Sequence, residues 1–186
     1  MKSQNTELVN LLYTRISHDL SGSIGAIYNG TEMLMEDLSL SPDMSLVLQN
    51  SAQTLMNRLV FFRQTFGMPV STADDTTAKY LKTLSVPVAL SGCCVNALQR
   101  SLCIILGDML PKGGKIEVTE NSLIASGAVL KEIKGLKDIL EKGAKTDKPE
   151  EAPALYAFYL AKQDEKSLSF SFGKKDIKIK IIQDPS

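Results

Sequence analysis

Residues 15–30 of the chain read RISHDLSGSIGAIYNG, and this stretch contains His18, the one histidine of the sequence. Apolar residues recur around it about every 3.6 positions, which predicts a long amphipathic helix that begins near Asn5 or Thr6 and ends near Leu38. His18 falls on one side of this helix. The positions on the opposite side, where we expect the helix to pack, are Val9, Tyr13, Ile16, Leu20, Ile24, Ile27, Thr31, Leu34 and Leu38.

The face that carries His18 is nearly bare of large side chains. Arg15 lies one turn before the histidine, and Gly22, Gly25 and Asn29 follow it on the same face. Glycine inside a helix costs about 1 kcal/mol relative to alanine, so this helix gives up stability for a surface that another molecule can approach closely. The alternative is that the glycines let neighbouring helices pack tightly and that His18 is an exposed polar residue without a role.

The motif His18-Asp19-Leu20, followed by a small residue, resembles the H-box of two-component histidine kinases and phosphotransferases, in which the helical histidine is phosphorylated. Together with Gly25-Ala26-Ile27 and Asn29-Gly30, it is similar to the alphaproteobacterial histidine phosphotransferases of the ChpT type. Ser23 stands where that family usually has proline, so we expect this helix to bend less just past the histidine.

A second helix is predicted from Ser41, with Pro42 in its first turn, to Gly67. The segment 58–67, RLVFFRQTFG, also resembles the end of this helix in the ChpT-like family. We expect the two helices to form an antiparallel hairpin. The second helix carries apolar residues at near-heptad spacing, namely Met44, Leu48, Ala52, Leu55, Leu59, Phe62 and Phe66.

A lone hairpin of two helices leaves apolar surface uncovered. Met56 and Val60 widen the apolar stripe of the second helix on one side, and Val47 widens it on the other. The simplest cover is a second copy of the hairpin, because two hairpins related by a two-fold axis make a four-helix bundle. We therefore expect a homodimer with His18 exposed on each side.

Proline and small polar residues at 68–75 predict a linker between a hairpin domain at residues 1–68 and a second domain at residues 74–186. The second domain is expected to be an α/β sandwich, which makes the fold class α+β. We expect its helices at 76–82, 95–110, 129–140 and 154–161, and a charged loop over 143–153. We expect strands at 85–90, which lies at an edge, at 115–119 and at 121–126. A final strand hairpin is expected to point six residues inward, namely Leu168, Phe170, Phe172, Ile177, Ile179 and Ile181.

The order of these elements resembles the ATP-binding domain of histidine kinases, and residues 109–114, MLPKGG, resemble the matching turn of the ChpT-like family. No Gly-x-Gly occurs in the sequence to bring backbone N–H groups close to phosphates. The 95–110 helix also lacks the carboxylate-then-asparagine spacing by which such kinases hold magnesium and phosphate. We therefore expect a degenerate ATPase-like domain that binds no ATP and no other cofactor.

Composition points away from several classes of protein. Lys and Arg number 21 and Asp and Glu number 21, so the net charge is zero and nothing indicates nucleic acid or anionic lipid as a partner. No apolar run reaches the roughly 18 residues of a membrane span, and the polar start resembles no signal peptide, which predicts a cytoplasmic protein. Cys93, Cys94 and Cys103 lack metal-ligand spacing and are expected to be reduced and buried.

The resemblance implies that His18 takes a phosphoryl group from the aspartate of one receiver domain and passes it to another. The expected partners are the receiver domains of a hybrid histidine kinase and of response regulators, and Mg²⁺ is expected to come from the receiver. Gly22, Gly25 and Asn29 would form the docking surface. Arg15 could stabilise the transferring phosphoryl oxygens, pair with the receiver, or be a surface charge without a role.

The role of Asp19 stays open from the sequence. It could accept a hydrogen bond from the other ring nitrogen of His18 or act as a base, as its counterpart does in kinases, or it could be a solvated carboxylate. Two other functions also stay open for the chain: a non-catalytic dimeric scaffold that binds receivers or kinases, and an ATP-dependent histidine kinase.

Overall fold

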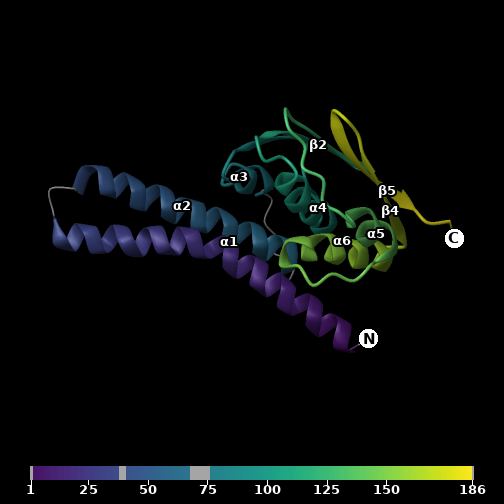
Figure 1. The fold of residues 1–186 in the computed structure, drawn as a ribbon, viewed down its shortest axis with the longest axis horizontal. Helices are drawn as coiled ribbons and strands as arrows, with labels where there is room; N and C mark the ends of the chain where they lie inside the picture. Colours follow the sequence, from purple (N-terminus) through teal and green to yellow (C-terminus); the bar gives the residue numbers. More distant parts are fainter. Residues whose placement is uncertain (1, 38–40, 68–75, 186) are drawn as a thin grey trace.

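The computed structural model describes residues 2–37, 41–67 and 76–185, and its fold is α+β. Two long helices, α1 (Lys2–Glu36) and α2 (Ser41–Phe66), project from a globular part (Figure 1). The expected hairpin is confirmed and is antiparallel, because Gly30 meets Leu48 while Asp19, earlier in α1, meets Arg58, later in α2. Helix α1 begins at Lys2 and not at Asn5 or Thr6, since the residues before these two continue the helix.

Packing between the two helices explains why one of the helix glycines, Gly30, is present. A Cβ atom at this position would lie 2.9 Å from Cδ2 of Leu48 and 3.1 Å from Sδ of Met44. The absence of a side chain therefore lets α1 and α2 approach closely at this point. Tight packing of neighbouring helices, the alternative reason for the glycines, holds at Gly30.

The globular part contains a five-stranded mixed sheet in the order β1-β2-β3-β5-β4. Strand β1 runs parallel to β2, and the other neighbours are antiparallel. The predicted edge strand and both predicted strand hairpins are confirmed. The predicted inward position of Phe172 is wrong, because this residue ends β4 and is 36% exposed. The strands are β1 (Val88–Ser91), β2 (Gly114–Thr119), β3 (Ser122–Ser126), β4 (Lys166–Phe172) and β5 (Asp176–Gln183).

Helices α4 and α6 lie between this sheet and the hairpin (Figure 1). Helix α4 contacts β2, β3 and α2, while α6 contacts β4 and α1. Asn96 begins α4, because its side chain accepts a hydrogen bond from the backbone N–H of Gln99, and residues 101–107 of α4 are all buried. The helices are α3 (Thr77–Leu81), α4 (Ala97–Asp108), α5 (Leu136–Lys142), the 3₁₀ turn η2 (Pro149–Glu151) and α6 (Ala152–Gln163).

Two predicted boundaries in the globular part are wrong. The helix expected from residue 129 begins only at Leu136, because Gly135 before it is left-handed, with φ of 80°. The charged loop expected over 143–153 contains η2 and the start of α6. Pro149 and Pro153 stand in the first turns of these two elements, where the missing N–H of proline has no cost.

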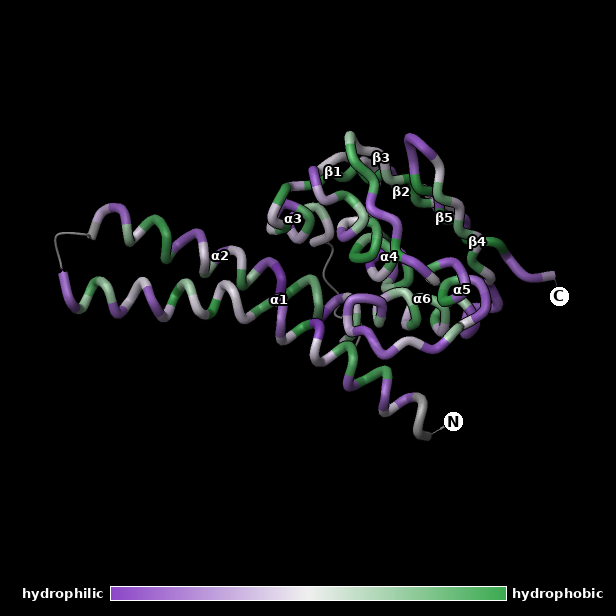
Figure 2. The backbone as a smooth tube through the Cα atoms, in the orientation of Figure 1, coloured by the Kyte–Doolittle hydropathy of each residue, from purple (hydrophilic) through white to green (hydrophobic). Residues whose placement is uncertain are grey.

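The predicted packing side of α1 is partly wrong. Ile16 and Leu20 pack against the core as expected, but Val9 and Tyr13 are 61% and 73% exposed. Leu8 and Leu12 are buried in their place. The globular part contacts a side of α1 that a helix wheel drawn for the hairpin alone does not indicate. Apolar positions occur along the whole of both long helices (Figure 2), and several of their side chains are exposed.

Cys94 and Cys103 are buried as predicted, with their Sγ atoms 3.4 Å apart, but Cys93 is exposed, so its predicted burial is wrong. The predicted linker at 68–75 and Leu38 lie outside the described residues. The division into two domains at 1–68 and 74–186 stays a prediction. In the described ranges, no helix combines the length and the apolar character needed to cross a membrane.

Candidate functional site

His18 lies in the middle of α1, and its side chain is 87% exposed. The two glycines that follow it border open space, because a Cβ atom at Gly22 or at Gly25 would meet no atom within 4 Å. Asn29 is exposed as well. Close packing within this chain therefore does not account for Gly22 and Gly25, in contrast to Gly30.

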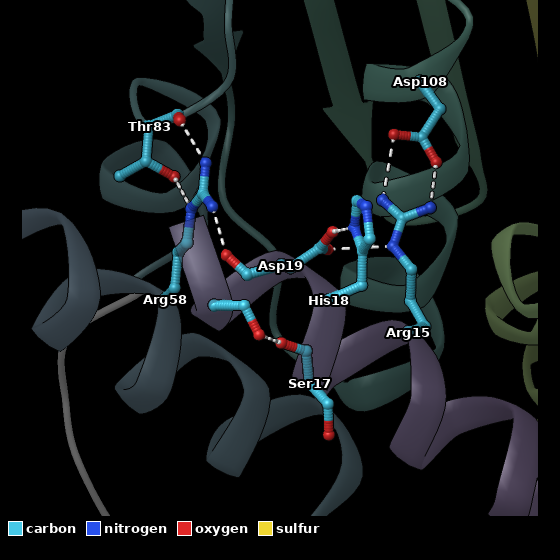
Figure 3. A network of polar contacts seen from close by, with 8 residues as sticks. Arg15, Ser17, His18, Asp19, Arg58, Thr83 and Asp108 are labelled. Atoms are coloured by element: carbon cyan, nitrogen blue, oxygen red, sulfur yellow. Dashed lines mark hydrogen bonds and ion pairs between the residues drawn. The ribbon is translucent and has the colours of Figure 1, made fainter. Parts of the chain in front are cut away.

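Asp19 is held beside the imidazole ring (Figure 3). Its Oδ1 atom lies 3.4 Å from Nδ1 of His18, and its Oδ2 atom accepts a hydrogen bond of 2.8 Å from Nε of Arg15. The side chain of Asp19 is 15% exposed, so the alternative of a solvated carboxylate is wrong. This geometry lets the carboxylate accept a hydrogen bond from Nδ1–H, in which case Nε2 keeps the free electron pair.

Arg15 is not the exposed cation that the sequence predicts. Its Nη1 and Nη2 atoms donate to Oδ2 and Oδ1 of Asp108 at 2.8 and 3.0 Å, and its side chain is 12% exposed. Burial lowers the pKa of Arg15, but the hydrogen bond and charge of Asp108, with the charge of Asp19, raise it above its ordinary value overall. Arg15 thus links α1 to the last residue of α4, a partner 93 positions away in the sequence.

Arg58 of α2 makes a second link, which the sequence analysis missed (Figure 3). Its Nη1 atom donates to the backbone carbonyl of Asp19, its Nη2 atom to the carbonyl of Thr83 at 2.6 Å, and its Nε atom to Oγ1 of Thr83 at 3.0 Å. The hairpin is therefore tied to the turn after α3 at the level of His18. The available signal was a charged residue next to an apolar run, because such a group needs a partner when it is buried. Arg58 precedes the run LVFF of α2, and Asp108 follows the run LCIIL of α4.

The buried aromatic ring of Tyr80 lies near the charged side chains of Arg15, Asp19, Arg58 and Asp108. Its ring stacks on Phe61 with 4.0 Å between the ring centroids, and its hydroxyl has no hydrogen-bond partner within the described ranges. Burial raises the pKa of the Tyr80 hydroxyl, and the charges of Asp108 and Asp19 raise it further. The network of Arg15, Asp19 and Asp108 is therefore shielded from water on its inner side.

A shallow, open depression of about 310 Å³ lies between α1 and α2. It begins at Gly22, one turn after His18, and its lining is small or polar. The residues around it are Gly22, Ser23, Ala26, Asn50, Ser51, Thr54 and Arg58. In the part of the chain that the structure describes, no group of three or more His, Cys, Asp or Glu residues could hold a metal ion.

Gly25→Ala is expected to raise the free energy of unfolding by about 1 kcal/mol, because the added methyl group enters open space and alanine favours the helix. Urea denaturation measures this change. Gly30→Ala is the matched control and should gain less, since its methyl group would crowd Leu48 and Met44. A Gly25→Ala protein no more stable than wild type would contradict the open surface seen here.

The fold has a counterpart among solved structures. A 1.7 Å structure of a bacterial phosphotransferase is similar to this chain, with a TM-score of 0.77 and 22% sequence identity, over 95% of this chain and 96% of that one. No protein-family model matches the sequence, and no curated protein matches it. This likeness shows the fold: a long helical hairpin followed by a mixed sheet with its helices, over nearly the whole of both chains.

Proposed function

We propose that this protein is a histidine phosphotransferase of a two-component phosphorelay. It carries a phosphoryl group between the aspartates of receiver domains through a phosphohistidine at His18. One observation carries the proposal: the sole histidine is 87% exposed on a helix face without neighbouring bulk, and its ring contacts a carboxylate that is itself held in place. The likeness to a bacterial phosphotransferase supports the same class of function.

The proposed reaction uses Nε2 of the neutral imidazole as the nucleophile. Its electron pair attacks the phosphorus of an aspartyl phosphate, the P–N bond forms, and the bond from phosphorus to the aspartate oxygen breaks, so the carboxylate leaves. The Nδ1 proton stays hydrogen-bonded to Asp19, which compensates the positive charge that develops on the ring. The reverse sequence delivers the group to a second receiver.

The surface around His18 supports docking of a receiver. Gly22 and Gly25 leave space for a partner to approach the imidazole, and the depression that begins at Gly22 continues that surface between the two helices. Asn29 extends the same exposed face. Arg15 takes no direct part in this docking, since its guanidinium is occupied by Asp19 and Asp108. Mg²⁺ belongs to the receiver in this scheme.

The globular part is proposed to be a degenerate form of the histidine kinase ATPase domain that binds no ATP. The absence of Gly-x-Gly from the whole sequence supports this proposal, because backbone N–H groups then lack the close approach that a triphosphate needs. Its role in this scheme is to hold the hairpin through Arg15 and Arg58.

The experiment that tests the function offers the protein two phosphoryl donors. One sample receives a receiver domain phosphorylated on its aspartate, and the other receives Mg-ATP alone; acid-labile phosphate on the protein is then measured. Label from the receiver and none from ATP is the expected result. No label from a panel of receivers would favour the scaffold function, and label from ATP alone would make the protein a kinase.

We also propose that the protein is a homodimer in which two hairpins form a four-helix bundle in the cytoplasm. Exposed apolar side chains along both helices support this arrangement, because a four-helix bundle would bury them. On α1 they include Val9, Tyr13, Ile24, Tyr28 and Met35, and on α2 they include Leu46, Val47, Met56 and Leu59.

Ile24→Glu is expected to convert the dimer to a monomer, because it places a charge within the proposed bundle. The molar mass is measured by light scattering during size-exclusion chromatography. It should be twice the 20.3 kDa of the chain for wild type and the mass of one chain for the variant. Val129→Glu is the matched control, since Val129 is 47% exposed on the globular part and Ile24 is 52% exposed. A wild-type protein with the mass of one chain would refute the bundle.

A further inference from the structure

We propose that Asp108, the last residue of α4, is a positioning residue for His18 and acts on it through Arg15 and Asp19. The inference rests on the proposed phosphoryl transfer through His18 and extends it to the globular part of the chain. It states that a carboxylate outside the hairpin decides how the imidazole is presented to the receiver.

The four side chains form one continuous series of polar contacts (Figure 3). Asp108 binds the two terminal nitrogens of Arg15, Nε of Arg15 binds Oδ2 of Asp19, and Oδ1 of Asp19 faces Nδ1 of His18. In the described part of the chain, Asp19 is the one hydrogen-bond and ion-pair partner of the imidazole. The orientation of the ring therefore depends on where this carboxylate is held.

Asp108 fixes the direction in which Arg15 donates. The two bonds of 2.8 and 3.0 Å bind the planar guanidinium at both terminal nitrogens, which defines its plane and with it the direction of the Nε–H bond. Without the Asp108 charge, Arg15 is free to turn its terminal nitrogens toward Asp19. The side chains are only 12% exposed for Arg15 and 23% exposed for Asp108, which limits how far water can take the place of either partner.

Asp19 in turn decides which ring nitrogen carries the proton. A neutral imidazole has one N–H, and the hydrogen bond that one nitrogen makes determines the tautomer. A carboxylate fixed at Nδ1 favours the Nδ1–H tautomer and leaves the electron pair on Nε2. A displaced Asp19 removes that preference and lowers the fraction of the ring that is ready to attack phosphorus.

The test reads the tautomer directly, without a partner. His18 is the sole histidine, so the imidazole ¹⁵N signals of the full-length protein come from one residue. We expect the wild-type ring to be mainly Nδ1–H in its neutral form, and Asp108→Asn, which keeps the shape and removes the charge, to shift it toward Nε2–H. The rate of transfer from a phosphorylated receiver should fall about tenfold or more in this variant.

Arg100→Met is the matched control. Arg100 is also on α4 and also reaches the hairpin, through a 3.5 Å contact from Nη1 to the carbonyl of Gln64, but it has no connection to His18. This variant should keep the wild-type tautomer and a transfer rate within about twofold of wild type. In a protein that already carries Asp19→Asn, adding Asp108→Asn should change neither the tautomer nor the transfer rate further, because the Asp19 carboxylate that connects Arg15 to His18 is already lost.

Three results decide between this inference and others. A wild-type tautomer and rate in Asp108→Asn would overturn it. Equal losses of rate in Asp108→Asn and Arg100→Met with an unchanged tautomer would also overturn it. The ion pair of Arg15 and Asp108 would then serve only to hold the hairpin on the globular part. A tautomer shift in Asp108→Asn without transfer from a panel of receivers would support the positioning of the ring and refute the proposed function instead.

Discussion

His18→Gln is expected to abolish phosphoryl transfer to this protein, with a fall in rate of at least about a thousandfold. The amide nitrogen of glutamine shares its electron pair with the carbonyl group and is no nucleophile. The sequence holds no second histidine that could take over. Because the His18 side chain is 87% exposed and glutamine favours helices, the variant should unfold at the same urea concentration as wild type.

The measurement is the acid-labile phosphate that each protein takes from a phosphorylated receiver. Asp19→Asn serves as the control variant, because it keeps the nucleophile and removes only the carboxylate beside Nδ1; it should still be labelled, about tenfold more slowly. Full labelling of His18→Gln, or label that survives acid, would place the phosphoryl group on another residue and rule out the phosphohistidine.

Much of the fold follows from local patterns in the sequence. Apolar residues at helical spacing predict α1 and α2, and alternation of isoleucine with lysine predicts β5. The pattern of β5 succeeds because the strand buries its isoleucine face, and those of α1 and α2 succeed although each helix buries only part of its apolar face. The same kind of pattern wrongly predicted a helix in the segment before Leu136. Leu130 and Ile133 pack against the core there without forming a helix, and the spacing of apolar residues alone does not distinguish the two cases.

The candidate site shows where such reasoning stops. A helix wheel correctly leaves His18 on an open face, because that property depends on α1 alone. The contact of Asp19 with the ring stayed open from the sequence, because Arg15, which holds Asp19, is itself bound by Asp108 of α4. The same wheel leaves Arg15 exposed, because the carboxylate that binds it comes from α4. Arg58 was missed for the same reason: its partner Thr83 lies on another element. Long-range polar pairs depend on tertiary packing, which spacing along one helix does not encode.

Arg15→Met is expected to lower the free energy of unfolding by about 2 kcal/mol, less than the roughly 3 kcal/mol or more that breaking a fully buried ion pair costs, because this pair is only partly buried. Methionine keeps most of the apolar stem of the arginine and its packing. The loss arises because Asp108 and Asp19 then lose their common cation while 23% and 15% exposed, respectively. Urea denaturation, with a comparison of midpoint and slope, measures this change.

The matched control removes a cation from an exposed pair of the same length. Lys142 lies 2.8 Å from Asp138, but these side chains are 73% and 55% exposed, so Lys142→Met should leave the midpoint nearly unchanged. Adding Asp108→Leu to Arg15→Met should restore part of the lost stability, because one of the two unpaired carboxylates is then replaced by an apolar side chain. If the double variant is instead less stable than Arg15→Met alone, Asp108 stabilises the fold through contacts other than Arg15, and the link between α1 and α4 is not the ion pair.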